Sequence, residues 1–459
     1  MIIALALVFP AIAGLTFLAV DAGRHYNLHT SLQSAADAFA LAGAAELDRR
    51  PDAITRAERA IGIKSQSLVA NDALFGDGGE LDISVRFLNQ LDAPVDVEPP
   101  EARDARFIEV TINPVALSNP TIAKILGLAG EVRTAASATA GFEQAVCEFA
   151  PFFICNPFEN KAVSLFEAVQ SPQWRKRLIA LRDPQGDQWF PGNYGFLAAP
   201  DGSGASALRD MIAIDRPPLC FTQSEVETEP GAMAGPVRRA INVRFDLYAG
   251  DMNNRRSDPR YRPARNVRKG YSGKNCNQQE PGDPDVIRGL PRDDCFETSS
   301  CEAINAHSGG RFGDGEWDID GYWQTNYETD PPDTVNGRPK SQASRYDVYM
   351  EELEGFGQLY KHEAGTGSMT EIGEPICYSG PQWAFDDPLD RRMLNAAVVN
   401  CIEHDLSGRD RAPAIAFVRL FLTEPVGEDN AIFAELVDII EPGVPGAETM
   451  LRDIVQLYR

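Results

Sequence analysis

The chain has 459 residues, and its 43 Lys and Arg against 67 Asp and Glu give a formal net charge of −24. This charge opposes binding to nucleic acid or to anionic lipid headgroups, so the expected partners are proteins. Because a single hydrophobic core seldom grows beyond about 250 to 300 residues, the length predicts more than one domain.

The first 20 residues contain no charged side chain. At about 1.5 Å per residue, a helix of this length reaches about 30 Å, the thickness of the hydrocarbon layer of a bilayer. We therefore predict a transmembrane helix over residues 1–20. Two alternatives are a secretory signal peptide, with a cleavage-like Ala11-Ile12-Ala13 triplet, and a buried helix of a soluble protein. The missing basic n-region and an apolar run that continues past the triplet favour the anchor.

Residues 31–45 are rich in alanine and contain no proline. They predict that the apolar helix continues as a single helix into water. Small side chains along one face would let another helix approach closely, either from a partner or from a second copy of the chain. The residues predicted for this helix packing are Leu32, Ala35, Ala36, Phe39 and Gly43.

The N-terminal stretch carries a recognisable pattern. Its apolar segment contains Ala4-Leu5-Ala6-Leu7 and Pro10, Asp21-x-Gly23-Arg24 follows, and the run Leu32–Ala44 comes next. This pattern resembles the N-terminal module of TadE/TadG-like proteins of the Flp (Tad) pilus-assembly system. The resemblance implies a bacterial single-pass inner-membrane protein with its C-terminal bulk in the periplasm, which serves pilus assembly or anchoring without enzymatic activity. It also implies pilus-assembly or pilin-like membrane proteins as partners.

Two features depart from the family pattern. The usual basic leader is absent before the apolar run, which leaves N-terminal processing open. No Glu stands at or near Leu5, where polymerising pilins of this kind carry one, so we keep a minor pilin-like subunit or adhesin only as the alternative. A von Willebrand A domain is excluded, because residues 201–205 and 405–409 both lack the second Ser of its Asp-x-Ser-x-Ser motif.

Between residues 48 and 142 the apolar pattern changes from helical to alternating. Residues 48–67 keep helical spacing, and residues 122–128 suggest a short helix. The predicted strands are residues 81–87, 107–112 and 132–140. The predicted fold class is α+β, in which residues 21–142 form a pilin-like domain, a helix laid against a small antiparallel sheet.

Residues 143–459 are predicted to form a mixed α/β extracytoplasmic region. We expect a helix at 162–181, an aromatic turn at 189–197 and strands at 241–248 and 415–422. Further stretches are similar to the extracytoplasmic part of TadG-like proteins, namely Trp189-x-Pro191-Gly192-Asn193-Tyr194-Gly195, Gly313-Asp314-Gly315-x-Trp317-Asp318 with Tyr322-Trp323, Ser344-Arg345-Tyr346-Asp347-x-Tyr349, and Asp390-Arg391-Arg392.

A long loop is predicted over residues 250–347, which are rich in Gly, Pro, Asp, Asn and Arg. It begins with a basic island, residues 253–262 and 265–269. The favoured interpretation of this island is a solvated, flexible loop. The alternative is a docking patch for an acidic partner surface.

All cysteines follow residue 146, and a segment that directs the chain out of the cytoplasm predicts that they form disulfides. They are Cys147, Cys155, Cys220, Cys276, Cys295, Cys301, Cys377 and Cys401. Across a Pro-containing turn, Cys147 is expected to pair with Cys155. The remaining pairs, Cys377 with Cys401, Cys295 with Cys301 and Cys220 with Cys276, are guesses, because many connectivities are possible. Zinc-type CxxC spacing is absent.

No catalytic, cofactor or metal site is predicted. The sequence lacks HExxH, GxSxG and GxxxxGK[ST]. His25 and His29 have the i, i+4 spacing of metal ligands. The favoured interpretation is that they are surface residues beside a membrane. The acidic run 314–321 matches an EF-hand loop only in part, because Tyr327 stands where a calcium loop needs a bidentate Glu. An aromatic and acidic turn is therefore the favoured interpretation.

Overall fold

The computed structural model has an α+β fold with disulfides, as predicted, and divides into two compact units. Unit 1 is Met1–Gln144 with Asp453–Arg459, and unit 2 is Ala145–Arg452. This division does not test the predicted domain limits 1–20, 21–142 and 143–459. The structure describes residues 2–48, 50–69, 82–91, 101–102, 105–117, 132–182, 188–199, 204–232, 234–272, 276–277, 280–304, 310–354, 373–440 and 450–458. The predicted helix at 122–128 lies outside them.

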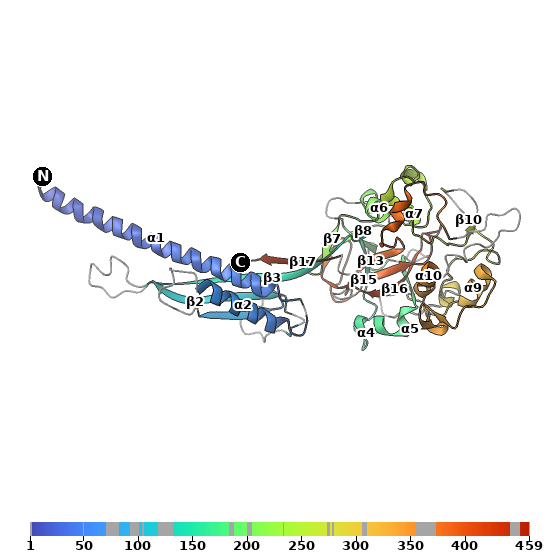
Figure 1. Ribbon diagram of the computed structural model, residues 1–459, viewed down its shortest axis with the longest axis horizontal. Coiled ribbons are helices and arrows are strands. Elements are labelled where there is room, and N and C mark those ends of the chain that lie inside the picture. The colour runs from blue at the N-terminus through green and yellow to red at the C-terminus, as the bar shows by residue number, and fades with distance from the viewer. Residues whose placement is uncertain are drawn as a thin grey trace. The chain divides into compact units, whose positions relative to one another are not determined.

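Unit 1 is a helix packed on a sheet (Figure 1). Its elements are α1 (Ile2–Ala44), α2 (Ala53–Val69), β1 (Ile83–Leu88), β2 (Phe107–Leu117), β3 (Val132–Cys147) and β17 (Leu451–Leu457). The sheet order is β1-β2-β3-β17, with β1, β2 and β3 paired antiparallel. The predicted helix-on-sheet arrangement is thus found, and the C-terminal strand β17 is an addition that local sequence did not indicate.

The core of unit 1 contains alternate side chains of its strands β2 and β3. Ile108, Val110 and Ile112 of β2 are fully buried, whereas Glu109 between them points away and pairs with Arg86. Across the register, β3 places Ala136, Ala138 and Ala140 opposite Ile112, Val110 and Ile108. Because alanine adds little bulk, α1 can lie close to the sheet.

Unit 2 is built on a mixed sheet in the order β14-β8-β6-β4-β13-β15-β16-β5. All its described pairs are antiparallel except the parallel pair β4 and β13. The strands are β4 (Phe152–Cys155), β5 (Leu178–Arg182), β6 (Asn193–Leu197), β8 (Val226–Pro230), β13 (Met393–Val399), β14 (Arg411–Ala412), β15 (Ala414–Leu422) and β16 (Ile432–Ile439). The predicted strand at 415–422 is β15, and it is mostly buried.

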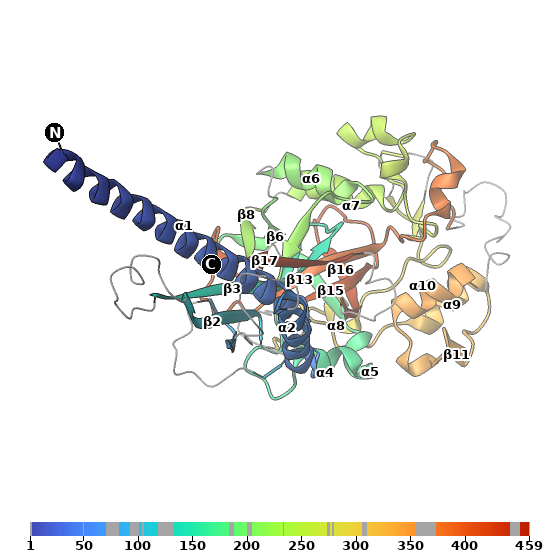
Figure 2. The same cartoon turned by 60° about the vertical axis from the view of Figure 1, so that its left-hand side comes forward.

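Shorter elements surround this sheet (Figure 2). The helices are α4 (Leu165–Gln170), α5 (Pro172–Arg175), α6 (Ala205–Ala213), α7 (Ala234–Val243), α8 (Asp294–Glu297), α9 (Ile319–Tyr327) and α10 (Arg345–Glu354). The 3-10 turns are η1 (Gly250–Arg255), η2 (Pro259–Tyr261), η3 (Lys340–Gln342) and η4 (Gln382–Asp386). The remaining strands are β7 (Cys220–Thr222), β9 (Tyr271–Ser272), β10 (Glu280–Pro281), β11 (Thr334–Val335) and β12 (Arg338–Pro339). The predicted long loop therefore contains regular elements.

Two predicted elements of unit 2 are wrong. The helix expected at 162–181 is broken at Ser171 and Pro172 into α4 and α5, and the apolar residues after them form the buried strand β5. The strand expected at 241–248 is the end of α7 followed by a turn at Asp246, whose φ is +65°. Apolar alternation there reflects burial on a helix end rather than a strand.

All eight cysteines form disulfides, but the expected partners are mostly wrong. The structure pairs Cys147 with Cys220, Cys155 with Cys401, Cys276 with Cys377 and, as expected, Cys295 with Cys301. Strand pairing explains the difference. Cys147 ends β3 directly opposite Cys220 of β7, and Cys155 ends β4 beside Val399 of β13, close to Cys401.

Candidate functional site

The surroundings of α1 change along its length. Side chains from Ile12 to Asn27 are mostly exposed, with Leu15 at 66% and Tyr26 at 72%, and the first buried side chain is Leu28. Figure 1 shows the N-terminal half of α1 extending beyond the strands on which its C-terminal half packs. One helix therefore has an uncovered apolar half and a half that belongs to a core.

The predicted membrane span is not confirmed. Among the residues that the structure describes, no helix combines the length and the apolarity needed to cross a bilayer. Side chains of residues 1–11, which form about half of the predicted span, lie outside the described ones.

The predicted helix-packing face lies inside unit 1. Leu32, Ala36 and Phe39 are fully buried, and Ala35 is 6% exposed. A Cβ atom on Gly43 would lie 2.6 Å from Cδ1 of Ile108 and 3.0 Å from Cδ1 of Ile61, so that position needs glycine. The face expected to receive a partner helix is therefore covered by the sheet and α2 of the same chain, whereas the side chains described between Ile12 and Asn27 are mostly uncovered.

The acidic run 314–321 is a helix-capping turn. The Asp318 carboxylate accepts a hydrogen bond from the Gly321 N–H at the start of α9 and pairs with Arg288 at 2.7 Å. Burial acts to raise the pKa of Asp318, but these two partners outweigh it and hold the pKa below its ordinary value. Glu316 and Asp320 each pair with a different lysine. Each of these carboxylates thus pairs with a different cationic side chain.

No metal centre appears in the described part of the chain, where no group of three or more His, Cys, Asp and Glu side chains is placed to hold an ion. His29 is exposed and His25 half-buried on α1, one turn apart. Two ligands on one helix do not complete a coordination shell.

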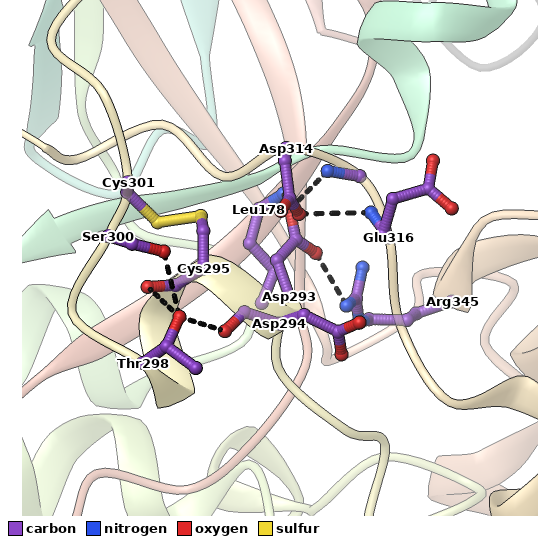
Figure 3. Close-up of a disulfide and its surroundings, with 11 residues drawn as sticks. Leu178, Asp293, Asp294, Cys295, Thr298, Ser300, Cys301, Asp314, Glu316 and Arg345 are labelled. Carbon is purple, nitrogen blue, oxygen red and sulfur yellow. Dashed lines mark hydrogen bonds and ion pairs between the residues drawn. A yellow bond between two sulfur atoms is a disulfide. The ribbon is translucent and has the colours of Figure 1, made fainter.

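Arg345 is the centre of a buried ionic cluster in unit 2 (Figure 3). Its guanidinium is fully buried and donates to Asp293 Oδ1 at 2.6 Å and to Glu435 Oε1 at 2.8 Å. It also lies over the Trp317 ring, 4.6 Å from the centroid. The backbone N–H groups of Arg345 and Tyr346 donate to Glu435, so this carboxylate also caps the start of α10.

Asp293 joins this cluster to the neighbouring loop. Its Oδ2 accepts hydrogen bonds from the backbone N–H of Gly315 at 2.7 Å and of Leu178 at 3.2 Å. A Cβ atom on Gly313 would fall 1.8 Å from Asp293 Oδ2, so Gly313 is required for this approach. Burial raises the pKa of Asp293 and of Glu435, and Arg345 opposes the shift. Figure 3 shows the disulfide of Cys295, in α8, beside the cluster.

Several of the motif-like stretches singled out in unit 2 make contacts that hold the fold together. Residues 313–318 and 344–349 meet at the Arg345 cluster, where Ser344 and Asp347 also cap α10 through reciprocal hydrogen bonds. In the stretch 189–195, the Trp189 indole N–H donates to the Leu181 carbonyl. Because the cluster is sealed from solvent, it can stabilise the fold but cannot receive a substrate.

Sequence reasoning missed Asp293 and Glu435. Glu435 lies in a strand whose neighbours are apolar and buried. An acidic residue inside such a strand is a usable signal, because a buried carboxylate requires a buried partner. Nothing local indicated that this partner would be Arg345.

The basic island is largely taken into unit 2. Arg262, Arg268 and Lys269 are buried, and Arg262 pairs with Asp215. Arg255 and Arg265 stay exposed. The favoured interpretation of a solvated loop is therefore wrong for the buried members, which bond within the unit.

Comparison with known proteins identifies the N-terminal part of the chain. Residues 1–46 match the family model of the Flp pilus-assembly TadE/G-like proteins. No curated protein and no solved structure matches the chain. The matched residues contain the whole of α1, including the uncovered apolar half and the half packed in unit 1. The N-terminal helix of this protein is thus a TadE/G-like module of the kind found in Flp pilus assembly.

Proposed function

We propose that this protein is a membrane-anchored, non-enzymatic component of Flp pilus assembly or anchoring. The observation that carries the proposal is the division of α1, whose N-terminal half has a TadE/G-like sequence, no charge before Asp21 and exposed apolar side chains. Such a helix needs an apolar environment, and a bilayer provides one. Residues 1–20 are then the anchor, and pilin-like membrane proteins or a second copy would meet the chain there.

The disulfides support a periplasmic location for the rest of the chain. All eight cysteines are paired, and such bonds persist in oxidising compartments. We infer a single-pass bacterial inner-membrane protein in which residues 21–142 form the helix-and-sheet domain and residues 143–459 the periplasmic region. Its mechanism would be binding rather than catalysis.

Cell fractionation tests the proposal. A C-terminal epitope tag should be recovered from the inner membrane and be accessible to protease in spheroplasts. Leu15→Arg places a charge inside the apolar half, at a cost of up to about 3 kcal/mol for membrane insertion, and should reduce membrane recovery and piliation. Asn27→Arg, beyond that half, is the matched control. Recovery of a shortened product in sheared pili would instead support a minor pilin, and a soluble wild-type product would refute the anchor.

A further inference from the structure

An exposed tryptophan stands on unit 2, in a segment that contacts the basic island. Trp383 lies in η4 with 65% of its surface exposed, and Ile376 of the same segment is 51% exposed. The segment folds back on itself, because the rings of Tyr378 and Phe385 contact each other with centroids 5.4 Å apart. Trp is enriched among the side chains that dominate protein contacts, so an exposed Trp is a candidate contact residue.

Both ends of this segment are held in place. At its start, Cys377 is bonded to Cys276, and the buried Asp246 carboxylate accepts hydrogen bonds from the backbone N–H groups of residues 376, 377 and 378. At its end, the Arg265 guanidinium donates to the carbonyls of Phe385 and Asp387, each at 3.1 Å. Trp383 is therefore presented on a preorganised backbone, which lowers the entropic cost of binding.

The neighbouring residues carry positive charge. The Ser379 N–H donates to the Arg256 carbonyl, so residues 255–265 lie alongside this segment. Within the described chain, neither Arg255 nor Arg265 pairs with a carboxylate; Arg255 stacks on Tyr261, and Arg265 bonds only to carbonyls. Asp386 is exposed nearby, so the excess of positive charge is small, but it contrasts with a chain of net charge −24.

We propose that the Trp383 surface, made of Arg255, Arg265, Ile376 and Trp383, docks an acidic polypeptide segment that contains aromatic residues. Trp and Arg are the side chains that dominate protein contact sites, since Trp offers a large apolar area and Arg pairs with carboxylates and stacks on rings. The inference is independent of the proposed function.

A binding experiment with the full chain tests the proposal. The probe is a random copolymer of Glu and Tyr, titrated at low and high salt onto the chain in a non-ionic detergent, with a random copolymer of Lys and Tyr as the charge control. We expect saturable binding of the Glu copolymer only, weakened by salt because surface charges are screened. Trp383→Ala should weaken it at least about tenfold, and Arg255→Ala, which leaves the Arg265 contacts to the segment intact, should reduce its salt dependence.

The matched control is Phe166→Ala, which removes another exposed aromatic of unit 2 and should leave binding unchanged. Thermal unfolding of each variant shows that loss of binding is not loss of fold. The proposal is overturned if the Glu copolymer does not bind, if the Lys copolymer binds equally, or if Trp383→Ala binds like the wild type. Self-association, or binding to anionic vesicles, that depends on Trp383 would overturn it too, because the occupant would then be a second copy or a lipid.

Discussion

Fully buried arginines are stabilised in two different ways in unit 2. Arg345 is neutralised by carboxylates, whereas Arg391 donates to the carbonyls of Ala213 and Ile214 at the end of α6, where a helix favours a cation. Burial lowers the pKa of Arg391 to about 10, so it stays charged at neutral pH. Arg392 donates to the carbonyls of residues 422 and 423. Each guanidinium thus ties together segments distant in sequence.

Removing the cation of the Arg345 cluster should strongly destabilise unit 2. In Arg345→Met, Asp293 and Glu435 stay buried without their partner, at a cost of about 3–5 kcal/mol in the free energy of unfolding. Unfolding in urea, monitored by tryptophan fluorescence, measures this change in the free energy of unfolding. Arg411→Met, which breaks ion pairs of a 62% exposed side chain, is the control and should change little.

The loss in the free energy of unfolding caused by Arg345→Met, called the deficit below, should also depend on pH. Burial already raises the pKa of both carboxyl groups, so their stabilising contribution is complete below the ordinary carboxyl pKa of about 4 and is lost as the pH rises through the raised values. Without Arg345 those pKa values rise further. The deficit should therefore shrink as the pH falls from about 7 to about 4, and a deficit that does not change with pH would show that the carboxylates are not its source.

At the scale of the element, α1 is one continuous helix with two different environments along its length. From Leu28 onward its side chains build the core of unit 1, whereas those described from Ile12 to Asn27 are mostly exposed. The close approach of Ile61 and Ile108 explains Gly43, and the alanines of this half are buried in the same core, so a separate partner helix is not needed to account for them.

Two glycines of α1 allow a matched test of this division. Gly43→Leu forces a side chain into Ile108 and Ile61 and should lower the stability of unit 1 by about 1–3 kcal/mol or more. Gly23→Leu, where a Cβ atom meets nothing within 4 Å, should leave it unchanged. Limited proteolysis of unit 1 and its thermal unfolding report the difference. Equal behaviour of the two variants would show that α1 does not pack as described.

On the scale of the whole molecule, the chain passes from unit 1 to unit 2 after Gln144 and returns after Arg452. All four disulfides lie within unit 2. Their loops differ greatly in size, because the sequence separation is 6 for Cys295 and Cys301 but 246 for Cys155 and Cys401. A cross-link that closes a longer loop restricts the unfolded chain more.

Deleting these two disulfides should therefore have unequal effects. By chain entropy, Cys155→Ala with Cys401→Ala should cost about 3 kcal/mol more than Cys295→Ala with Cys301→Ala. Thermal unfolding of the two double variants under identical oxidising conditions compares them directly. If the short-loop variant were the less stable one, the small disulfide would owe its effect to the adjoining Asp293 and Arg345 contacts instead.

Features encoded within a few residues could be predicted from the sequence. The uncharged run, the alanine-rich helix and the alternating strands of unit 1 all follow from local spacing, and the TadE/G-like module was identifiable from its motif. The prediction that the cysteines form disulfides rests on interpreting the apolar N-terminal segment as one that directs the chain out of the cytoplasm. Helical and strand periodicities are properties of adjacent residues, so they need no knowledge of the fold.

Only the tertiary structure decided which distant residues meet. Cys147 lies eight residues from Cys155 but bonds to Cys220, because two strands place them opposite each other. Arg345 finds Glu435, and β17 joins a sheet whose other strands are in the first part of the chain. Such pairings depend on the burial of charge and on strand register across the whole chain, and both are set by the packing of the complete fold rather than by local spacing.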